Sequence, residues 1–213
     1  GEVASQLVEG HTDRAVELLK ETAALDPTHS KTIAARKALA RIYYEQGSFE
    51  QALEQLAEVL ELNPRDPNAH FLQGRIYLAQ DNGLQAVTSF RQVVKDYPDK
   101  AEAYVLLARA HEMLGEHGLA AETLKRAISI DPEHQSARRA LIRHYLDGGR
   151  WQEAILELKR LQEKHPSDPS LAAQIGDIYA VKGEYEQARE AYETVEAMRP
   201  DDVLGHLKLG RLA

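Results

Sequence analysis

The sequence predicts an all-α solenoid of antiparallel helix pairs, because three kinds of residue recur along it every 34 residues. Prolines stand at Pro64, Pro98, Pro132, Pro166 and Pro200. Rings stand at Tyr43, Tyr77, His111, Tyr145 and Tyr179. Alanines stand at Ala52, Ala86, Ala120, Ala154 and Ala188. A fixed period of this length is typical of helix–turn–helix repeats, in which each unit buries its apolar face against its neighbours.

Composition supports a purely helical chain. Good helix formers dominate the 213 residues, and β-branched residues never gather into alternating runs. We expect no sheet and a single elongated domain over residues 1–213. The formal net charge of −8 argues against a general nucleic-acid binder. No apolar run approaches the ~20 residues that span a bilayer, so we expect no membrane insertion of this segment.

The N-terminal segment, residues 1–29, is predicted to be a partial repeat whose first helix is truncated. Gly10, Ala15, Leu19 and Pro27 have the same mutual spacing as the equivalent residues of the next unit, which are Gly47, Ala52, Leu56 and Pro64. The two prolines are 37 residues apart, three more than the period, and the additional residues fall near positions 30–32. They indicate either a longer connection or an extra helical turn.

Five complete repeats are predicted to follow, and a partial repeat, residues 203–213, ends the sequence. The complete repeats are residues 33–66, 67–100, 101–134, 135–168 and 169–202. Each should contain a first helix of about 14 residues, a turn and a second helix that ends before its proline. The predicted turns lie at Gly47, Asp81–Gly83, Gly115, Gly148–Gly149 and Gly183. Glycine accepts a positive φ at little cost, and proline cannot continue a helix.

These series resemble the tetratricopeptide repeat (TPR) family, and the resemblance covers nearly the whole chain. It implies a right-handed superhelical solenoid whose first helices line a concave groove. Phrases such as GRIYLAQDNGLQAV look like bacterial multi-repeat arrays associated with envelope assembly and exopolysaccharide export. Repeats that are cut at both ends predict a fragment of a longer array.

The family pattern asks for small residues on the first helix of each repeat and large apolar residues facing them. The small residues are Ala40, Gly74, Ala108 and Gly176, and the large ones are Leu56, Phe90, Leu124, Leu158 and Tyr192. Three residues depart from the pattern. Ile142 replaces a small residue, Gln73 replaces an expected leucine and Gly83 replaces an expected aromatic residue. We expect these departures to alter local packing but not the fold.

The sequence predicts no catalytic site, cofactor or metal. The nine histidines are scattered, and His111 with His117 does not have the zinc-protease spacing. His111 occupies the ring position of its repeat, where we expect a packed, half-buried side chain. No glycine-rich loop is placed to cradle a phosphate, since Gly148–Gly149 is predicted to be a turn between helices.

A series of arginines is the strongest candidate for a binding site. These residues lie two positions before the rings, at Arg41, Arg75, Arg109 and Arg143, and Arg211 continues the series after Asp177 interrupts it. The resemblance implies that this position points into the groove, together with Lys37 and Arg139 four residues earlier in their repeats. Guanidinium groups suit carboxylates, phosphates or sulfates. The apolar residues expected beside them are Tyr44, Phe71, Leu78, Val105, Met113 and Leu146.

Ion pairs within one helix are the alternative role for these arginines. Their spacings allow pairs worth ~0.2–0.5 kcal/mol each. The pairs would be Arg41 with Glu45, Arg109 with Glu112 and Arg143 with Asp147. Arg75 has Phe71, Leu78 and Ala79 on its face and no carboxylate within one turn. Arg75 is therefore the arginine that we most expect to contact a ligand.

The sequence thus predicts a non-catalytic protein-interaction scaffold that binds an extended or helical, acidic segment of a partner protein in the groove. The alternative is a module that binds an anionic polysaccharide in a bacterial exopolysaccharide or envelope export system. Nucleic acid is not an expected partner, and self-association through uncapped repeat ends is a further expectation. With no cysteine and no targeting segment in these residues, the sequence is compatible with either cytoplasm or periplasm and leaves the localisation unknown.

Overall fold

The computed structural model describes residues 2–25, 30–199 and 203–211, and these residues form helices and no strand. The all-α prediction is confirmed. The chain divides into two compact units, Gly1–Glu133 and His134–Ala213. Among the described residues, no helix combines the length and the apolar content that crossing a bilayer requires.

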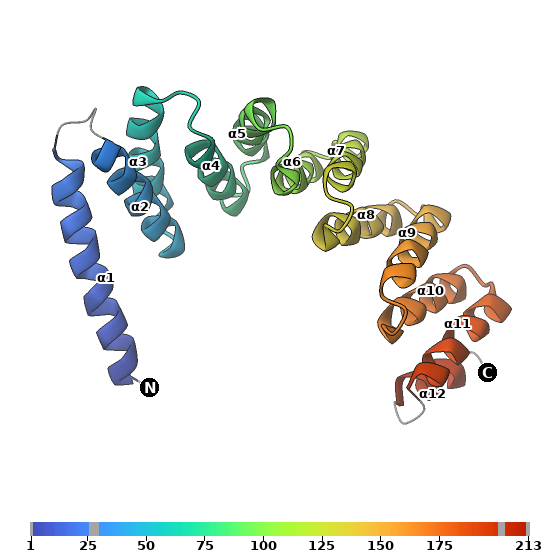
Figure 1. Cartoon of the computed structure of the whole chain (residues 1–213). Helices are drawn as coiled ribbons and strands as arrows, with labels where there is room; N and C mark the ends of the chain where they lie inside the picture. The colour runs from blue at the N-terminus through green and yellow to red at the C-terminus, as the bar shows by residue number, and fades with distance from the viewer. Residues whose placement is uncertain (1, 26–29, 200–202, 212–213) are drawn as a thin grey trace. The chain divides into compact units, whose positions relative to one another are not determined.

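Unit 1 contains helices α1 to α7, and each packs against the next one in the chain (Figure 1). Helix α4 also contacts α2 and α6, so the first helices of successive pairs lie side by side. The helices of unit 1 are α1 (Glu2–Ala23), α2 (Ser30–Glu45), α3 (Phe49–Leu62), α4 (Pro67–Ala79), α5 (Gly83–Asp96), α6 (Ala101–Met113) and α7 (His117–Ile130).

Unit 2 contains helices α8 to α12, and each again packs against the next. They are α8 (Gln135–Asp147), α9 (Trp151–Lys164), α10 (Pro169–Val181), α11 (Tyr185–Met198) and α12 (Val203–Gly210). The antiparallel pairing predicted from the period is confirmed within each unit.

Each helix pair is joined by a three-residue connection whose middle residue has a positive φ. The middle residues are Gly47, Asp81, Gly115, Gly149 and Gly183. In the first connection the amide of Ser48 donates to the carbonyl of Tyr43 at 2.8 Å, and every later connection repeats this bond. This pattern is the Schellman motif, which needs a left-handed residue after the helix and thereby explains the glycines. Asp81 fills that position without being a glycine, at φ 55°.

The extra residues after Pro27 lengthen a helix. Helix α2 has 16 residues, whereas α4, α6, α8 and α10 have 13. Of the two options that the sequence left open, a longer connection or an extra helical turn, the structure shows the extra turn. Thr32 lies in that turn, is fully buried, and its hydroxyl is 3.4 Å from the carbonyl oxygen of Thr22 on α1. Helix α1 is itself uninterrupted and runs through Gly10, the position that the repeat spacing equates with the turn at Gly47.

In four of the five helix pairs the core matches a small residue on the first helix to a large one on the second, and Ile142 is the exception. A Cβ atom built on Gly74 would lie 2.7 Å from Cζ of Phe90, and one built on Gly176 would collide with the ring of Tyr192. The two pairs that have an aromatic ring at this position of the second helix are thus the two that have glycine at the facing position of the first. Of the departures, Ile142 is buried, and Gln73 accepts a hydrogen bond from the buried Ser89 hydroxyl at 3.0 Å. Both are accommodated without any change of fold.

Candidate functional site

The first helices of unit 1 carry two adjoining hollows that together form a groove. The hollow between α2 and α4 has a volume of about 730 Å³, and the hollow between α4 and α6 has about 480 Å³. Tyr44, Phe71 and Arg75 line both. The first hollow is completed by Lys37, Ala38, Arg41, Glu45, Asn68 and Leu72, and the second by Leu78, Ala79, Glu102, Leu106 and Arg109. We call this surface the unit 1 groove.

Arg75 is held at the centre of the unit 1 groove by an aromatic ring. Its Cζ atom lies 4.8 Å from the centroid of the Tyr44 ring, which is a cation–π contact. Beside it, Nζ of Lys100 lies 4.2 Å from the centroid of the Phe71 ring. Neither Arg75 nor Arg109 forms an ion pair with the residues that the structure describes. Two guanidinium groups in one hollow therefore keep their donors available.

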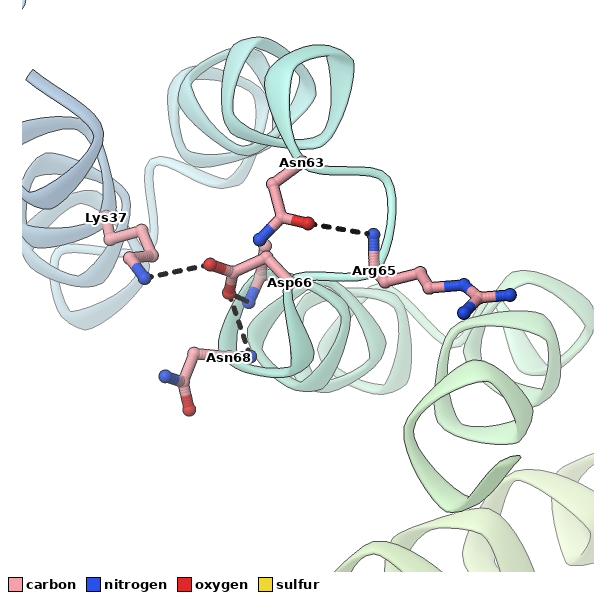
Figure 2. A network of polar contacts seen from close by, with 6 residues as sticks. Lys37, Asn63, Arg65, Asp66 and Asn68 are labelled. Atoms are coloured by element: carbon pink, nitrogen blue, oxygen red, sulfur yellow. Dashed lines mark hydrogen bonds and ion pairs between the residues drawn. The ribbon is translucent and has the colours of Figure 1, made fainter. Parts of the chain in front are cut away.

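Lys37, in contrast, is already paired. Its Nζ atom lies 2.9 Å from Oδ2 of Asp66, the residue that caps the N-terminus of α4 (Figure 2). The other carboxylate oxygen of Asp66 accepts from the amides of Asn68 at 3.0 Å and Ala69 at 2.9 Å. Burial acts to raise the pKa of Asp66, but the hydrogen bonds from Lys37, Ala69 and Asn68 outweigh it and leave the pKa below its ordinary value. The pair thus links α2 to the N-terminus of α4 through a lysine that lines the first hollow.

The same two repeat positions, the fifth and the thirty-fourth, interact again elsewhere. Lys37 and Asp66 occupy these positions in one repeat, and Phe71 and Lys100 occupy them in the next, as a cation–π pair. In unit 2 they hold Arg139 and Asp168. The hydrogen bond from Ser170 lowers the pKa of Asp168, and the charge of Arg139 adds to that shift.

One of the three predicted pairs within a helix forms. Nε of Arg41 lies 3.2 Å from Oε1 of Glu45, and both side chains are exposed. Neither Arg109 nor Arg143 forms an ion pair in the described part of the chain, although both have a carboxylate at suitable spacing. The arginine series is therefore less neutralised by its own helices than the spacing allows.

Unit 2 has a smaller recess that contains two further arginines of the predicted site. It has a volume of about 280 Å³ and is lined by Arg139, Ile142, Arg143, Leu146, Leu158, Leu161, Leu171 and Gln174. Arg139 and Arg143 are one turn apart on α8 and both are exposed. We call this feature the unit 2 recess.

Asp177, which interrupts the arginine series, is committed to internal contacts. It accepts hydrogen bonds from the Tyr192 hydroxyl at 2.7 Å and from Nζ of Lys208 at 2.5 Å. Burial, together with the bond to Asp177, raises the pKa of Tyr192. Arg211 is exposed just beyond α12 and lines none of the hollows described above.

The remaining predicted residues lie outside the hollows. Val105 is half-buried on α6, and Met113 packs against the core cluster around Phe90. Sequence reasoning missed Leu72 and Leu106, which line the unit 1 groove. They stand 34 residues apart, so the period itself was a signal that could have found them.

His111 is fully buried rather than half-buried. Only 2% of its surface is exposed, and its Nδ1 atom lies 2.5 Å from Oε2 of Glu116. Within the described ranges, no group of three or more histidine and acidic side chains is placed to hold a metal ion. The buried ring fills a packing position between α6 and α7 and is not presented at the surface.

Solved structures with the same fold include MamA and YrrB. A crystal structure of MamA protein matches 81% of this chain and 94% of its own, with a TM-score of 0.70 and 22% identity. The structure of YrrB, described as a TPR protein with an unusual peptide-binding site, matches 91% of this chain and 98% of its own, with a TM-score of 0.68 and 20% identity. Identities this low establish the fold alone.

Curated relatives are also distant. The DnaJ protein P58IPK homolog B of Oryza sativa subsp. japonica is 26% identical over 95% of this chain, and the Protein CTR9 homolog of Arabidopsis thaliana is 28% identical over 84%. This chain spans only 39% and 17% of their lengths. None of these likenesses indicates an acidic partner, an anionic polysaccharide or a bacterial envelope.

Family models account for nearly all of the sequence. A model described as tetratricopeptide repeat matches residues 7–76 and 113–175, and a second with the same description matches residues 74–134. A third, described as TPR repeat, matches residues 176–212. The period, the helix pairs and these matches agree, and the chain belongs to the tetratricopeptide repeat family.

Proposed function

We propose that this chain is a non-catalytic scaffold whose unit 1 groove binds an acidic, extended or helical segment of a partner protein. Proteins of the TPR family are generally protein-interaction scaffolds, and their fold is typically non-catalytic. The observation that carries the acidic preference is the state of Arg75 and Arg109. Both line one hollow, and neither has an ion-pair partner among the described residues.

The groove offers two kinds of contact at once. Carboxylates can accept two parallel hydrogen bonds from one guanidinium, and such charge-assisted bonds are stronger than neutral ones. Tyr44, Phe71 and Leu106 provide partly exposed apolar surface beside the two arginines. Burying such surface contributes roughly 25 cal/mol per Å², so apolar side chains of the partner supply affinity while its acidic groups set the register.

The repeat spacing suggests a spacing for the ligand. Packed helices lie ~8–10 Å apart, so arginines on successive first helices are separated by roughly 10–20 Å. An extended peptide advances ~3.3 Å per residue, which places matching acidic groups about three to six residues apart. Between them, one or two apolar residues would face Tyr44 and Phe71.

The test is a selection of random 12-residue peptides on the intact 213-residue chain, followed by affinity measurements by fluorescence anisotropy. We expect the selected peptides to combine acidic and apolar residues. An Arg75→Glu, Arg109→Glu double variant should weaken their binding by about tenfold or more, because charged hydrogen bonds are lost and repulsion is added. The matched control, Arg91→Glu with Arg126→Glu, makes the same charge change at exposed positions on α5 and α7.

Two outcomes would contradict the proposal. Peptides that bind both double variants equally well would place the interaction away from the unit 1 groove. Selected peptides without acidic residues would remove the role of the arginines. The polysaccharide alternative would be favoured if polygalacturonate displaced the peptides at low concentration and bound the chain at least as tightly as the peptides do.

A further inference from the structure

The unit 2 recess brings two positively charged side chains together. Arg139 and Arg143 stand one turn apart on α8, a spacing at which like charges destabilise a helix slightly. Neither forms an ion pair within the described residues of the chain. The eight side chains that line the recess include no carboxylate.

In unit 1 the equivalent positive charges are paired with carboxylates. Lys37 and Arg41 occupy the same repeat positions on α2, and each has a carboxylate partner, at 2.9 Å for Lys37 and 3.2 Å for Arg41. In unit 2 the counterpart of Asp66 is Asp168, whose Oδ1 accepts from the amide of Ser170 at 2.9 Å and from its hydroxyl at 2.7 Å. Asp168 therefore influences Arg139 by its charge but does not pair with it.

Below the two arginines the recess is apolar. Ile142, Leu158, Leu161 and Leu171 are buried residues of its lining, and Leu146 is partly exposed. Its volume of about 280 Å³ lies at the lower limit of the ~300–1,000 Å³ typical of sites that enclose a whole small molecule. A recess of this size suits one apolar side chain next to an anionic group.

We propose that the unit 2 recess binds a phosphorylated serine or threonine of a partner protein, with the phosphate on Arg139 and Arg143 and a neighbouring aliphatic side chain in the recess. One guanidinium is sufficient for a carboxylate, which has two oxygens and one charge. A phosphate monoester has three acceptor oxygens and a charge near −2 at pH 7, so it can satisfy both guanidinium groups. Gln174, which also lines the recess, offers a neutral donor and acceptor to the peptide backbone.

The probes are three pools of nine-residue peptides that differ only at their central residue, which is phosphoserine, serine or glutamate. The flanking positions are mixtures of leucine, isoleucine, valine, alanine and serine. Retention of each pool on the immobilised 213-residue chain is quantified at physiological salt. We expect the phosphoserine pool to be retained about tenfold or more over the serine pool, with glutamate intermediate, as charge-assisted hydrogen bonds predict.

Two double variants identify the site. Arg139→Gln with Arg143→Gln should abolish the preference for phosphoserine, while Arg75→Gln with Arg109→Gln removes the same charge from the unit 1 groove and should leave it intact. All four arginines are exposed, so we expect unchanged far-ultraviolet circular dichroism in both variants.

Three results would overturn this proposal. They are equal retention of the phosphoserine and serine pools, equal retention of the phosphoserine and glutamate pools, and a preference that survives loss of Arg139 and Arg143. The proposal does not rest on the unit 1 groove. A failure here leaves the acidic-segment proposal standing, and a failure of the peptide selection leaves this one standing.

Discussion

Gly74 and Phe90 are complementary in size, because a Cβ atom on Gly74 would lie 2.7 Å from Cζ of the phenyl ring. The ring is fully buried and cannot move aside freely. Gly74→Ala should therefore destabilise the protein by about 1 kcal/mol net, since overpacking costs ~1–3 kcal/mol and alanine in a helix recovers ~0.8–1.0 kcal/mol. Urea unfolding followed by circular dichroism measures the change.

A second substitution isolates this contact. Gly74→Ala with Phe90→Leu recreates the combination of Ala40 and Leu56 in the preceding pair. The double variant should be more stable than the sum of the two single effects predicts, by a coupling of about 1 kcal/mol. Additive effects would mean that the alanine fits without touching the ring.

Asp81 has a positive φ of 55°, and no other non-glycine residue does so in the part of the chain that the structure describes. It occupies a turn position that is glycine in the other four helix pairs. Asp81→Gly should stabilise the α4–α5 connection by up to about 1 kcal/mol, because glycine adopts this conformation without steric cost. The reverse change at an equivalent site, Gly115→Ala, should destabilise by about 1 kcal/mol. Thermal unfolding midpoints that move in the same direction for both variants would contradict this account.

The Asp66 cap predicts a stability that depends on pH. Its pKa is lowered on folding, so the carboxylate stabilises the protein fully above the unfolded pKa near 3.8, and this stabilisation is lost as the pH falls through the folded value. Asp66→Asn keeps a good N-cap but does not titrate. The stability difference between the native chain and this variant should shrink below about pH 4, which unfolding curves between pH 2.5 and 6 will measure. A difference that grows as the pH falls would exclude a lowered pKa.

Unit 2 contains a buried ion pair. Nη1 of Arg138 lies 2.5 Å from Oε2 of Glu157, and both side chains are 8% exposed. Glu157→Ala should cost about 3–5 kcal/mol, because it removes a buried carboxylate that both Arg138 and Arg160 contact. Replacing both residues, as Arg138→Leu with Glu157→Leu, should recover most of that loss. If the single variant costs less than 1 kcal/mol in urea unfolding, water reaches the pair.

The period predicted the helices, their turns and the packing of small against large residues, because these features depend on a local sequence pattern that recurs in every repeat. Asp81 is instructive here. It was placed in a turn, but its left-handed backbone follows from the Schellman hydrogen bonds, which a sequence does not display. Gly10 shows the converse, since spacing alone equated it with a turn and the structure continues the helix through it.

The site was predicted less completely because its charges interact across helices. The sequence search for partners stopped at one helical turn, whereas Lys37 finds Asp66 29 residues away and Arg75 meets Tyr44 from the preceding pair. The same limit made Arg109 and Arg143 look neutralised by carboxylates that they do not engage. Which residues line the hollows depends on side-chain packing, and this is how Leu106, rather than Val105, comes to face the groove.

The ion pair between Lys37 and Asp66 also holds neighbouring helices together. It ties two successive helix pairs through Lys37, which lines the first hollow. An anion entering that hollow would compete with Asp66 for the same ammonium group. Occupancy of the first hollow by an anion would then weaken the contact between α2 and the start of α4, and an empty hollow would leave that contact intact.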